Sequence, residues 1–499
     1  MKSPLDDLLP NASSSSVRIR RLDLGDSATP PEQLFSALGR NPHTNLLLSG
    51  GVHPLSRFSF IGLDPFLVLT AKGRKLSVVR LPDGRRREFD GDPFECLRAV
   101  LDRFRFRRPW EGPDHPPFIA GGIGYLAYEL GRQLEKLPAT ALDDLGLPEM
   151  YFAFYRALLC HDRTTNAYTL YWVDPAHSDS AADAGGSLET LGGRLRDLLG
   201  SSAPPPGSFR PNSLSPVFHS NFTRADYLEA IRCALEYIRA GDIYQVNLSQ
   251  RFRTSYDGDP WGLFLRLYEI NPAPFFAYLD PGPFQVLSSS PERFLFVQGD
   301  RVETRPIKGT LPRGPTPEAD AELGRELLAS EKNRAELAMI TDLLRNDLGR
   351  VCAFGSVVVE EQARLEAYTN VFHLVSVVSG RLAPGRDRID LLRATFPGGS
   401  ITGCPKIRAM EIIDELEPTV RSVYTGSIGY LGFDGSMDLN IAIRTLIRKG
   451  ADLFYQAGGG IVFDSVPDLE YEETLHKAAS IRKAILDTSL AIGPENSVL

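Results

Sequence analysis

Apolar and polar residues follow two different periods after residue 222, and each period predicts one element. Thr223 is a residue type that caps helices, and apolar residues follow it at helical spacing as far as Gly241, namely Tyr227, Ile231, Leu235 and Ile238. The segment from Tyr244 to Phe252 then predicts a strand. Helix and strand patterns go on alternating irregularly, with many aromatic and β-branched strands. We therefore expect an α/β (α+β) protein with large, mainly antiparallel sheets rather than a regular parallel barrel.

One boundary stands out along the chain. A strand pattern over Tyr168–Val173 is followed by a stretch rich in Ala, Ser, Asp and Gly, a short helical pattern from Leu188 to Leu199, and a Ser- and Pro-rich run at 201–207. This composition is typical of a linker. We therefore expect an N-terminal region over residues 1–175, a linker over 176–222 and a second region over 223–485.

Two short segments repeat each other. The segment Gly122–Leu126 reads GIGYL and the segment Ser427–Leu431 reads SIGYL, which hints at two related halves. The first also matches the GxGxxA pattern of dinucleotide-binding folds through Gly122, Gly124 and Ala127. No acidic residue follows about 20 positions later at the end of a second strand, and Pro138 interrupts the region, so we reject a dinucleotide site.

Composition and charge narrow the class of protein. The chain has 499 residues, of which 42% are hydrophobic and 24% charged, as expected of a globular protein large enough for two domains. A net charge of −8 argues against nucleic acid or an anionic membrane as the main partner. The five cysteines are scattered without metal-site or disulfide spacing, which fits a reducing cytoplasm. No apolar run has the length of a leader core or a membrane span.

A lysine between a proline and a glycine is the first candidate for chemistry. The run Arg305-Pro306-Ile307-Lys308-Gly309-Thr310 places the amine of Lys308 where a close-packed substrate could reach it. The alternative is a solvated lysine in an exposed turn, which is the commoner use of such a run. The rest of the C-terminal region favours chemistry.

Two carboxylates and a lysine form the second candidate. Glu470, Glu473 and Lys477 are spaced so that a helix presents all three on one face, although a solvated charged face has the same pattern. The glycines at 458–460 precede them, and we interpret these as a loop whose backbone N–H groups approach an anion. Carboxylates next to an anion site suit Mg²⁺, which takes a few protein carboxylates, waters and a substrate oxygen.

A second glycine-rich turn and a lone arginine extend this candidate site. The segment Phe396–Lys406 precedes a helical run over Ile407–Leu416, so its amides and hydroxyls could hold an anion at a helix N-terminus. Arg444 is interpreted as a strand residue among apolar neighbours, where its guanidinium would be costly to bury without a carboxylate. Together these features indicate a small polyanionic substrate.

The order of the motifs resembles one family. From about residue 223 to 485 the chain carries YQVNLSQRF, SSSPERF, PIKGT, RNDLGRV, FHLVSVVSG, FPGGSITGCPKIRAM, GSIGYLG, IAIRT, GGGIVFDS and EYEET. This order resembles the chorismate-utilising enzymes. The N-terminal LLLSG, which ends in Ser49 and Gly50, is similar to the leading region of anthranilate and aminodeoxychorismate synthases. The resemblance implies two pseudo-related halves whose antiparallel sheets stack, with helices outside and a buried chorismate site.

Two positions indicate the branch of the family. The third residue of the PIxGT motif is typically alanine in anthranilate, isochorismate and salicylate synthases, but lysine in the aminodeoxychorismate synthases, and here it is Lys308. Gln245 stands where lysine is typical of the members that use water. The resemblance thus implies amination of chorismate at C4, on the route to p-aminobenzoate and folate. The alternatives are an anthranilate synthase component I and, in another class, a non-catalytic regulator that binds chorismate or an amino acid.

The resemblance also implies roles for individual residues. Glu292 would be the general acid, Lys308 the nucleophile and His373 part of the active-site floor; Glu336 and Glu473 would bind Mg²⁺, with Glu470 as an outer carboxylate. An acid kept protonated and an amine kept neutral call for a closed site. The substrate contacts that the resemblance implies are Gln245, Thr310, Ser400, Tyr424, Arg444, Gly458, Gly460 and Lys477.

Some positions depart from the family pattern. Asn333 stands three positions before Glu336, where relatives often carry an acid, so the outer metal shell depends on Glu470 or water. The LLLSG motif and the run at 271–275 lack residues common in tryptophan-inhibited members, which argues against tryptophan feedback but allows a structural tryptophan near Ser49. RNDLGR is interpreted as a helix end with Gly349 as its left-handed cap.

The nitrogen source is expected to be a second protein. No cysteine lies in the GxCxG pattern that a glutaminase nucleophile requires, and Cys404 is followed by Pro405 in the glycine-rich turn. The resemblance therefore implies ammonia delivered by a separate glutamine amidotransferase subunit in a heterodimer.

Overall fold

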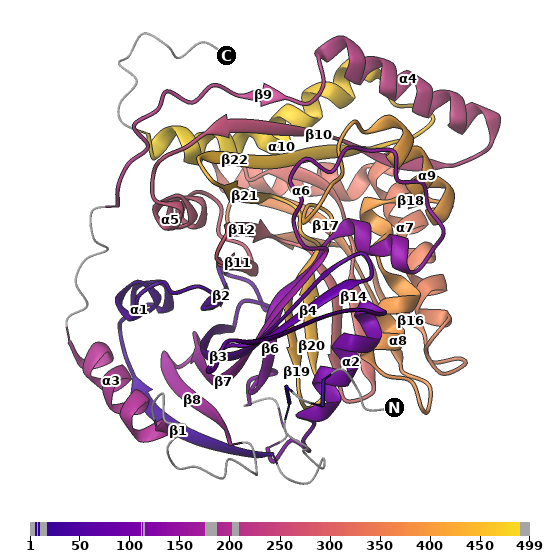
Figure 1. Ribbon diagram of the computed structural model, residues 1–499. Coiled ribbons are helices and arrows are strands. Elements are labelled where there is room, and N and C mark those ends of the chain that lie inside the picture. Colours follow the sequence, from indigo (N-terminus) through magenta and orange to yellow (C-terminus); the bar gives the residue numbers. More distant parts are fainter. Residues whose placement is uncertain are drawn as a thin grey trace.

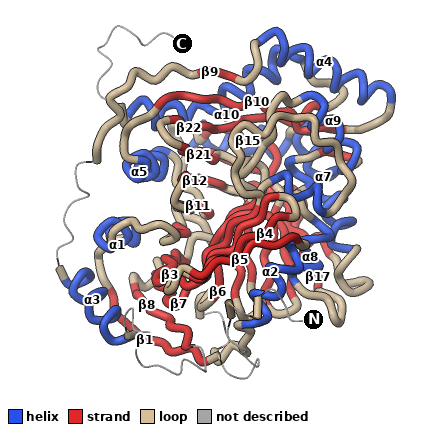
Figure 2. Tube along the Cα trace, in the orientation of Figure 1, coloured by secondary structure: helices blue, strands red, loops and turns tan. Residues whose placement is uncertain are grey.

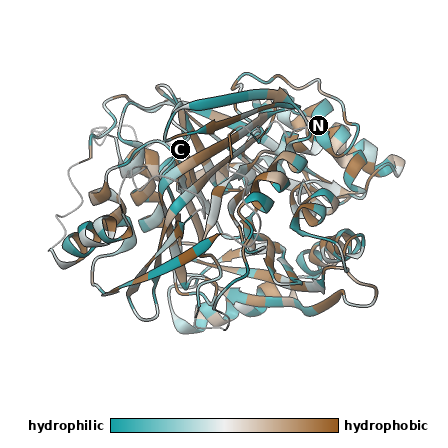
Figure 3. Cartoon of the chain, turned by 60° about the horizontal axis from the view of Figure 1, so that its bottom comes forward, coloured by the Kyte–Doolittle hydropathy of each residue, from teal (hydrophilic) through white to brown (hydrophobic). Residues whose placement is uncertain are grey.

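The computed structural model describes residues 5–6, 8–9, 17–110, 112, 115–174, 187–201 and 209–489. Within them strands cross the middle of the molecule and helices lie mostly at its periphery (Figures 1 and 2). Colouring by hydropathy shows brown apolar residues and teal polar residues on the same peripheral helices (Figure 3), as expected where one face packs on a sheet and the other faces water. None of these helices is long and apolar enough to cross a membrane.

The helices of the described residues are α1 (Pro31–Leu38), α2 (Pro93–Arg103), α3 (Leu188–Gly200), α4 (Arg224–Ala240), α5 (Pro260–Ile270), α6 (Pro317–Ala329), α7 (Glu331–Gly349), α8 (Arg388–Thr395), α9 (Lys406–Leu416) and α10 (Pro467–Asp487), with short 3₁₀ helices η1 (Tyr128–Gln133) and η2 (Gly399–Ile401). The predicted helix after Thr223 is confirmed as α4. The Thr223 side chain accepts a hydrogen bond from the Asp226 N–H, and Gly241 ends the helix in the left-handed conformation with φ of 82°.

The strands up to residue 174 are β1 (Arg18–Asp26), β2 (Asn45–Leu48), β3 (Phe58–Lys72), β4 (Lys75–Arg80), β5 (Arg85–Asp90), β6 (Gly121–Leu126), β7 (Met150–Asp162) and β8 (Ala167–Asp174). The later strands are β9 (His219–Ser220), β10 (Gln245–Ser255), β11 (Phe275–Leu279), β12 (Phe284–Ser290), β13 (Arg293–Gln298), β14 (Arg301–Arg305), β15 (Ile307–Pro312), β16 (Val358–Ala367), β17 (Val371–Arg381), β18 (Gly403–Cys404), β19 (Ser427–Gly432), β20 (Met437–Asn440), β21 (Thr445–Lys449) and β22 (Asp452–Ile461).

The described strands pair in antiparallel fashion and form two runs that share the N-terminal strands. One run leads from β3 through β2, β11, β12, β21 and β22 to β10. The other leads from β7 through β6, β19, β20, β13 and β14 to β17. The two runs meet where β3 pairs with β7. The expected mixed fold with mainly antiparallel sheets is confirmed.

The two repeated segments are neighbours in space. They form β6 and β19, which pair with each other so that Gly124 lies opposite Gly429, and the pairing is symmetric about these two glycines. A Cβ at Gly124 would lie 1.9 Å from the Tyr151 carbonyl oxygen, and one at Gly429 would lie 2.0 Å from the Asp438 carbonyl oxygen. Glycine is thus required at both positions by close approach of the next strand.

The predictions for the linker and for the end of the RNDLGR helix have different outcomes. The predicted helix at 188–199 is confirmed as α3, but residues 176–186 and 202–208 of the predicted linker lie outside the described residues. Helix α7 does end at Gly349, but this glycine is absent from the residues with positive φ, so its prediction as a left-handed cap is wrong. RNDLGR instead supplies Asp347, which is buried and forms an ion pair of 2.5 Å with Lys406 at the start of α9.

Candidate active site

Glu292 lies at the corner between β12 and β13 and is 4% exposed. The Ser290 hydroxyl donates to the Ile441 carbonyl over 2.6 Å, and the Ile441 N–H donates to the Glu292 carbonyl over 3.0 Å, so this corner is fixed on both sides. Burial raises the pKa of the Glu292 carboxyl to about 7, against the opposing effects of a hydrogen bond from Ser400 and the charge of Lys308. The side chain can therefore hold a proton at neutral pH.

Lys308 lies on β15 rather than in an exposed turn. The pairing of β15 with β17 shifts register between Lys308 and Thr310, and the intervening Gly309 has φ of 70°, so a bulge directly follows the lysine. Burial lowers the pKa of the Lys308 amine, and the Glu336 carboxylate acts in the opposite direction. The sequence alternative of a solvated lysine in an exposed turn is thus disfavoured, because Lys308 lies on a paired strand and is only partly exposed.

His373 and Thr310 face each other across β15 and β17. Their Nδ1 and Oγ1 atoms are 2.9 Å apart. Burial, reinforced by the charge of Arg444, lowers the pKa of the His373 imidazole to about 3, so the ring is neutral. The buried atoms His373 Nε2 and Gln245 Oε1 have no hydrogen-bond partner among the described residues. Buried polar atoms without a protein partner are expected where a ligand or water binds.

The glycines at 458–460 were expected to form a loop, and this is wrong. They belong to β22, where Gly460 pairs with Asn247 and Gly458 with Ser249 of β10. A Cβ at Gly460 would lie 2.2 Å from Gln245 Nε2 and 3.5 Å from Lys308 Nζ. The absence of a side chain at Gly460 therefore leaves room for the Gln245 and Lys308 side chains.

The two carboxylates expected on one helix face do lie together on α10. Both carboxylates lie close to Gly459 of β22: a Cβ on this glycine would lie 3.3 Å from Glu470 Oε2 and 3.5 Å from Glu473 Oε1. The Ser465 hydroxyl donates to Glu470 over 2.6 Å. Lys477 pairs with Glu473 at 2.5 Å and donates to the Gly458 carbonyl over 3.1 Å. The whole face is therefore directed at β22.

The charges on this face of α10 bear on whether Mg²⁺ could bind there. Burial and the neighbouring Glu473 raise the pKa of Glu470, whereas the pKa of Glu473 is lowered because its lysine neighbours, chiefly Lys477, together outweigh burial. Within the described part of the chain no three or more His, Cys, Asp or Glu side chains group as metal ligands. A site built from protein side chains alone is thus not formed, but Mg²⁺ accepts one or two carboxylates with waters and substrate oxygens. The donor set fits that kind of site.

Three further predicted residues come from separate segments of the chain. Ser400 is buried in η2, next to Glu292. Tyr424 is buried, and its hydroxyl lies near the Asn247 side chain. Arg444 was expected in a strand, and this is wrong: it precedes β21 with φ of 50°, and its carbonyl accepts hydrogen bonds from the Ser289 N–H at 3.1 Å and hydroxyl at 3.0 Å. A non-glycine residue with positive φ is often found at functional sites.

Asn247 was missed in the sequence. It lies two positions after Gln245, and residues two apart on a strand share a face, so the period of YQVNLSQRF was the available signal. The structure thus brings Lys308, Glu292 and Ser400 together with the α10 carboxylates.

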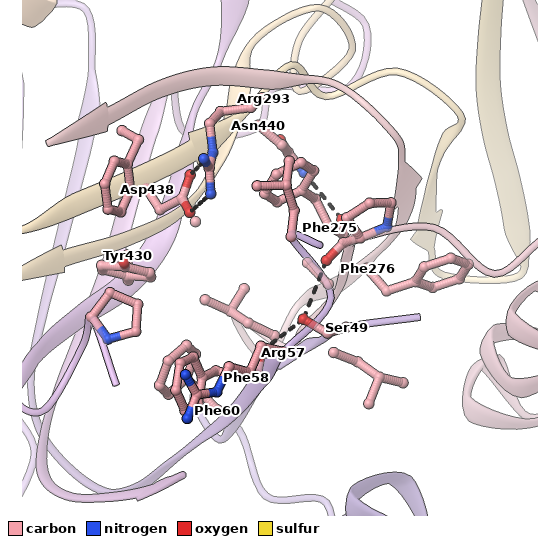
Figure 4. A pocket seen from close by; sticks show the side chains of 18 of the residues that line it. Ser49, Arg57, Phe58, Phe60, Phe275, Phe276, Arg293, Tyr430, Asp438 and Asn440 are labelled. Atoms are coloured by element: carbon pink, nitrogen blue, oxygen red, sulfur yellow. Dashed lines mark hydrogen bonds and ion pairs between the residues drawn. The ribbon is translucent and has the colours of Figure 1, made fainter. Parts of the chain in front are cut away.

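Ser49 lies apart from these residues, in a cavity of about 280 Å³ (Figure 4). Its hydroxyl donates to the Phe58 carbonyl over 2.6 Å. Phe275 lines the wall beside Arg293, whose guanidinium is 5.4 Å from the ring centroid and pairs with Asp438 at 2.8 Å. The lining is a mixture of aliphatic, aromatic and polar residues, among them several phenylalanines and Tyr430 and the Arg293–Asp438 ion pair, and the volume is near the lower end of small-molecule pockets.

Comparison with known proteins agrees with this geometry. A family model described as chorismate binding enzyme matches residues 57–483. The chain is 44% identical to aminodeoxychorismate synthase component 1 of Escherichia coli K12 over 91% of this chain and 96% of the relative. It is 42% identical to anthranilate synthase component 1 of Thermus thermophilus over 93% of this chain and 97% of the relative. The solved anthranilate synthase component I of Streptococcus pneumoniae superposes with a TM-score of 0.71 at 34% identity, covering 86% of this chain and 92% of that one. The chain therefore belongs to the family of chorismate binding enzymes.

Proposed function

We propose that this enzyme converts chorismate and ammonia to 4-amino-4-deoxychorismate, as an aminodeoxychorismate synthase component I. Overall similarity does not choose between this reaction and anthranilate synthesis, because relatives of both names match at similar identity. The observation that carries the proposal is Lys308, a partly buried amine of lowered pKa beside a carboxyl of raised pKa. A lowered pKa favours the neutral amine, which would be a nucleophile that an alanine at this position could not supply.

The two groups divide the first step between them. The neutral Lys308 amine forms a bond to C2 of chorismate, the ring double bonds shift, and the C4–O bond breaks. Glu292 gives its proton to the departing hydroxyl, which leaves as water. Ammonia then forms a bond to C4, the double bonds shift back, and the C2–N bond to Lys308 breaks, which frees the enzyme. The proton lost by ammonia returns the acid to its starting state.

The remaining predicted residues would hold the substrate. Arg444 and Lys477 bring positive charge to its carboxylates, and Thr310 and the neutral His373 form the floor of the site. Gln245, Ser400, Tyr424, Gly458 and Gly460 complete the proposed contacts. Glu336 and Glu473 would bind Mg²⁺ with Glu470 beside them, and Mg²⁺ would neutralise the charge of a substrate carboxylate.

A glutamine amidotransferase subunit is the proposed source of ammonia. Burial raises the pKa of Cys96 to about 12 and that of Cys352 to about 11, and it also raises those of Cys160 and Cys404. A glutaminase nucleophile needs a thiol of lowered pKa, so these four are poor candidates. The sequence expectation of a reducing cytoplasm stays a prediction.

Product analysis of the purified chain tests the proposal. With chorismate, Mg²⁺ and ammonium, we expect a product that neither fluoresces as anthranilate does nor appears together with pyruvate. Glutamine should not replace ammonium until an amidotransferase subunit is added. Anthranilate and pyruvate as products would favour an anthranilate synthase instead. Absence of any turnover would favour a non-catalytic regulator that binds chorismate or an amino acid.

The cavity around Ser49 is proposed to hold a structural tryptophan. The aromatic residues in its lining suit an indole ring, and Asp438 and Arg293 offer charges to an amino acid backbone. Tryptophan should raise the thermal midpoint of the protein without lowering turnover. Inhibition of turnover by tryptophan would instead indicate feedback control.

A further inference from the structure

Arg421 is the most completely bonded buried cation near the site. It is 1% exposed, and each of its five side-chain N–H groups has an acceptor. The acceptors are Glu417 Oε2 at 2.9 Å, Glu417 Oε1 at 2.6 Å, the Ile401 carbonyl at 2.9 Å, Thr425 Oγ1 at 3.5 Å and the Asn247 carbonyl at 2.6 Å. Such a fork of donors fixes the relative positions of everything that it touches.

The segments that Arg421 joins each carry a residue of the proposed substrate site. Ile401 directly follows Ser400 in η2, and Thr425 directly follows Tyr424. Asn247 lies on β10 with Gln245, and its side chain lies near the Tyr424 hydroxyl. One guanidinium therefore connects three segments that are remote from one another in sequence.

The turn that carries Arg421 is held from the N-terminal region. Glu129 of η1 is buried and accepts the backbone N–H groups of Arg421 at 2.8 Å and Ser422 at 2.9 Å. The Arg421 guanidinium also lies over the Tyr128 ring, 4.8 Å from its centroid. Ser422 and Thr425 have φ of 57° and 60°, a conformation that non-glycine residues keep only when their surroundings enforce it.

We propose that Arg421 is a positioning residue that sets Tyr424 and Ser400 for substrate, and that Glu129 extends this control from the N-terminal region. Neither residue has an assigned role in the reaction. The inference rests on the proposed function only in taking Tyr424 and Ser400 as substrate contacts. It gives the N-terminal region a direct part in the geometry of the active site.

The test is Arg421→Lys, with Arg388→Lys as the matched control. Lysine keeps the charge beside Glu417 but has three donors on one nitrogen in place of five on three nitrogens, so it cannot reach all the acceptors that surround the guanidinium. Arg388 is also buried, at 7% exposed, and donates to the carbonyls of Gly432 and Ser436, at the turn between β19 and β20. Misplacement of substrate contacts costs on the order of 100-fold in rate, so kcat/KM for chorismate should fall by about this factor in Arg421→Lys. It should stay within about twofold of wild type in Arg388→Lys, even where both variants lose thermal stability.

Coupling to Tyr424 separates positioning from general destabilisation. If Arg421 acts through Tyr424, the losses in Arg421→Lys and Tyr424→Phe will not multiply in the double variant. Full multiplication, or wild-type kcat/KM in a folded Arg421→Lys, would overturn the proposal. If Arg421→Lys fails to fold, Glu129→Gln is tested in its place, because this change turns one acceptor of the backbone N–H groups at Arg421 and Ser422 into a donor. Full multiplication with Tyr424→Phe, or wild-type kcat/KM in folded Glu129→Gln, would then overturn the proposal. The proposed function is tested separately, by identifying the product of the wild-type enzyme. The ratios of kcat/KM between variants and wild type do not depend on that result, because they can be measured with any product made from chorismate.

Discussion

Replacing Glu292 by glutamine tests the central claim about the site. Glutamine has nearly the same shape but no proton to release. With a pKa of about 7, half of the Glu292 side chains are protonated at pH 7. With the ordinary value of 4.5, only about 0.3% would be. Burial therefore increases the acid form more than about 100-fold, and loss of a general acid typically costs about 10² to 10⁴ in rate.

The same burial predicts that Glu292→Gln, which should lower turnover, raises the stability of the protein at high pH. Because the pKa is raised on folding, the stability that the protonated form contributes is fully present below pH 4.5 and is lost as the pH rises through 7. Above pH 7 the buried carboxylate destabilises the wild type by as much as about 3 kcal/mol. Glu292→Gln removes this effect. Its thermal midpoint should exceed that of wild type at pH 8, and the difference should shrink towards pH 5.

Two measurements check these expectations together. Chorismate consumption with saturating ammonium gives the loss in rate, and thermal unfolding at pH 5 and pH 8 gives the change in stability. Glu322→Gln on the exposed face of α6 is the control, and it should match wild type in both. A Glu292→Gln variant that keeps wild-type turnover, or that is no more stable than wild type at pH 8, would refute the assignment of Glu292 as a buried acid.

Three further predictions follow from the same site. Enzyme held with chorismate and Mg²⁺ but no ammonia should carry an adduct on Lys308, equal to chorismate less one water by denaturing mass spectrometry; unmodified Lys308 would count against covalent catalysis. Glu473→Gln should raise the Mg²⁺ concentration needed for half-maximal turnover, and an unchanged metal titration would place the ligand elsewhere. Gly460→Ala should lower turnover about tenfold or more by displacing Gln245, whereas Gly193→Ala, where a Cβ meets nothing within 4 Å, should not; equal turnover in both would show that the space at Gly460 is dispensable.

Local patterns in the sequence determined the elements whose signals are local. Thr223 and Gly241 fix the ends of α4 through a side-chain cap and a left-handed glycine, and both act within one helical turn. The spacing of Glu470, Glu473 and Lys477 placed them on one face of α10, because a helix repeats every 3.6 residues whatever it packs against. Motif order likewise identified the family, which the comparisons confirm.

Only the tertiary structure decided the state and the surroundings of the chemical groups. The glycines at 458–460 have the composition of a loop, but they form a strand because β10 offers them a partner. Arg444 has a positive φ rather than a strand conformation, and its carbonyl accepts hydrogen bonds from Ser289, which is remote in sequence. The acidity of Glu292 and the bonds of Arg421 depend on segments far away in sequence, and a pKa is set by burial and by charges in space. Sequence could name these side chains, but their chemistry arises only when folding removes water from around them.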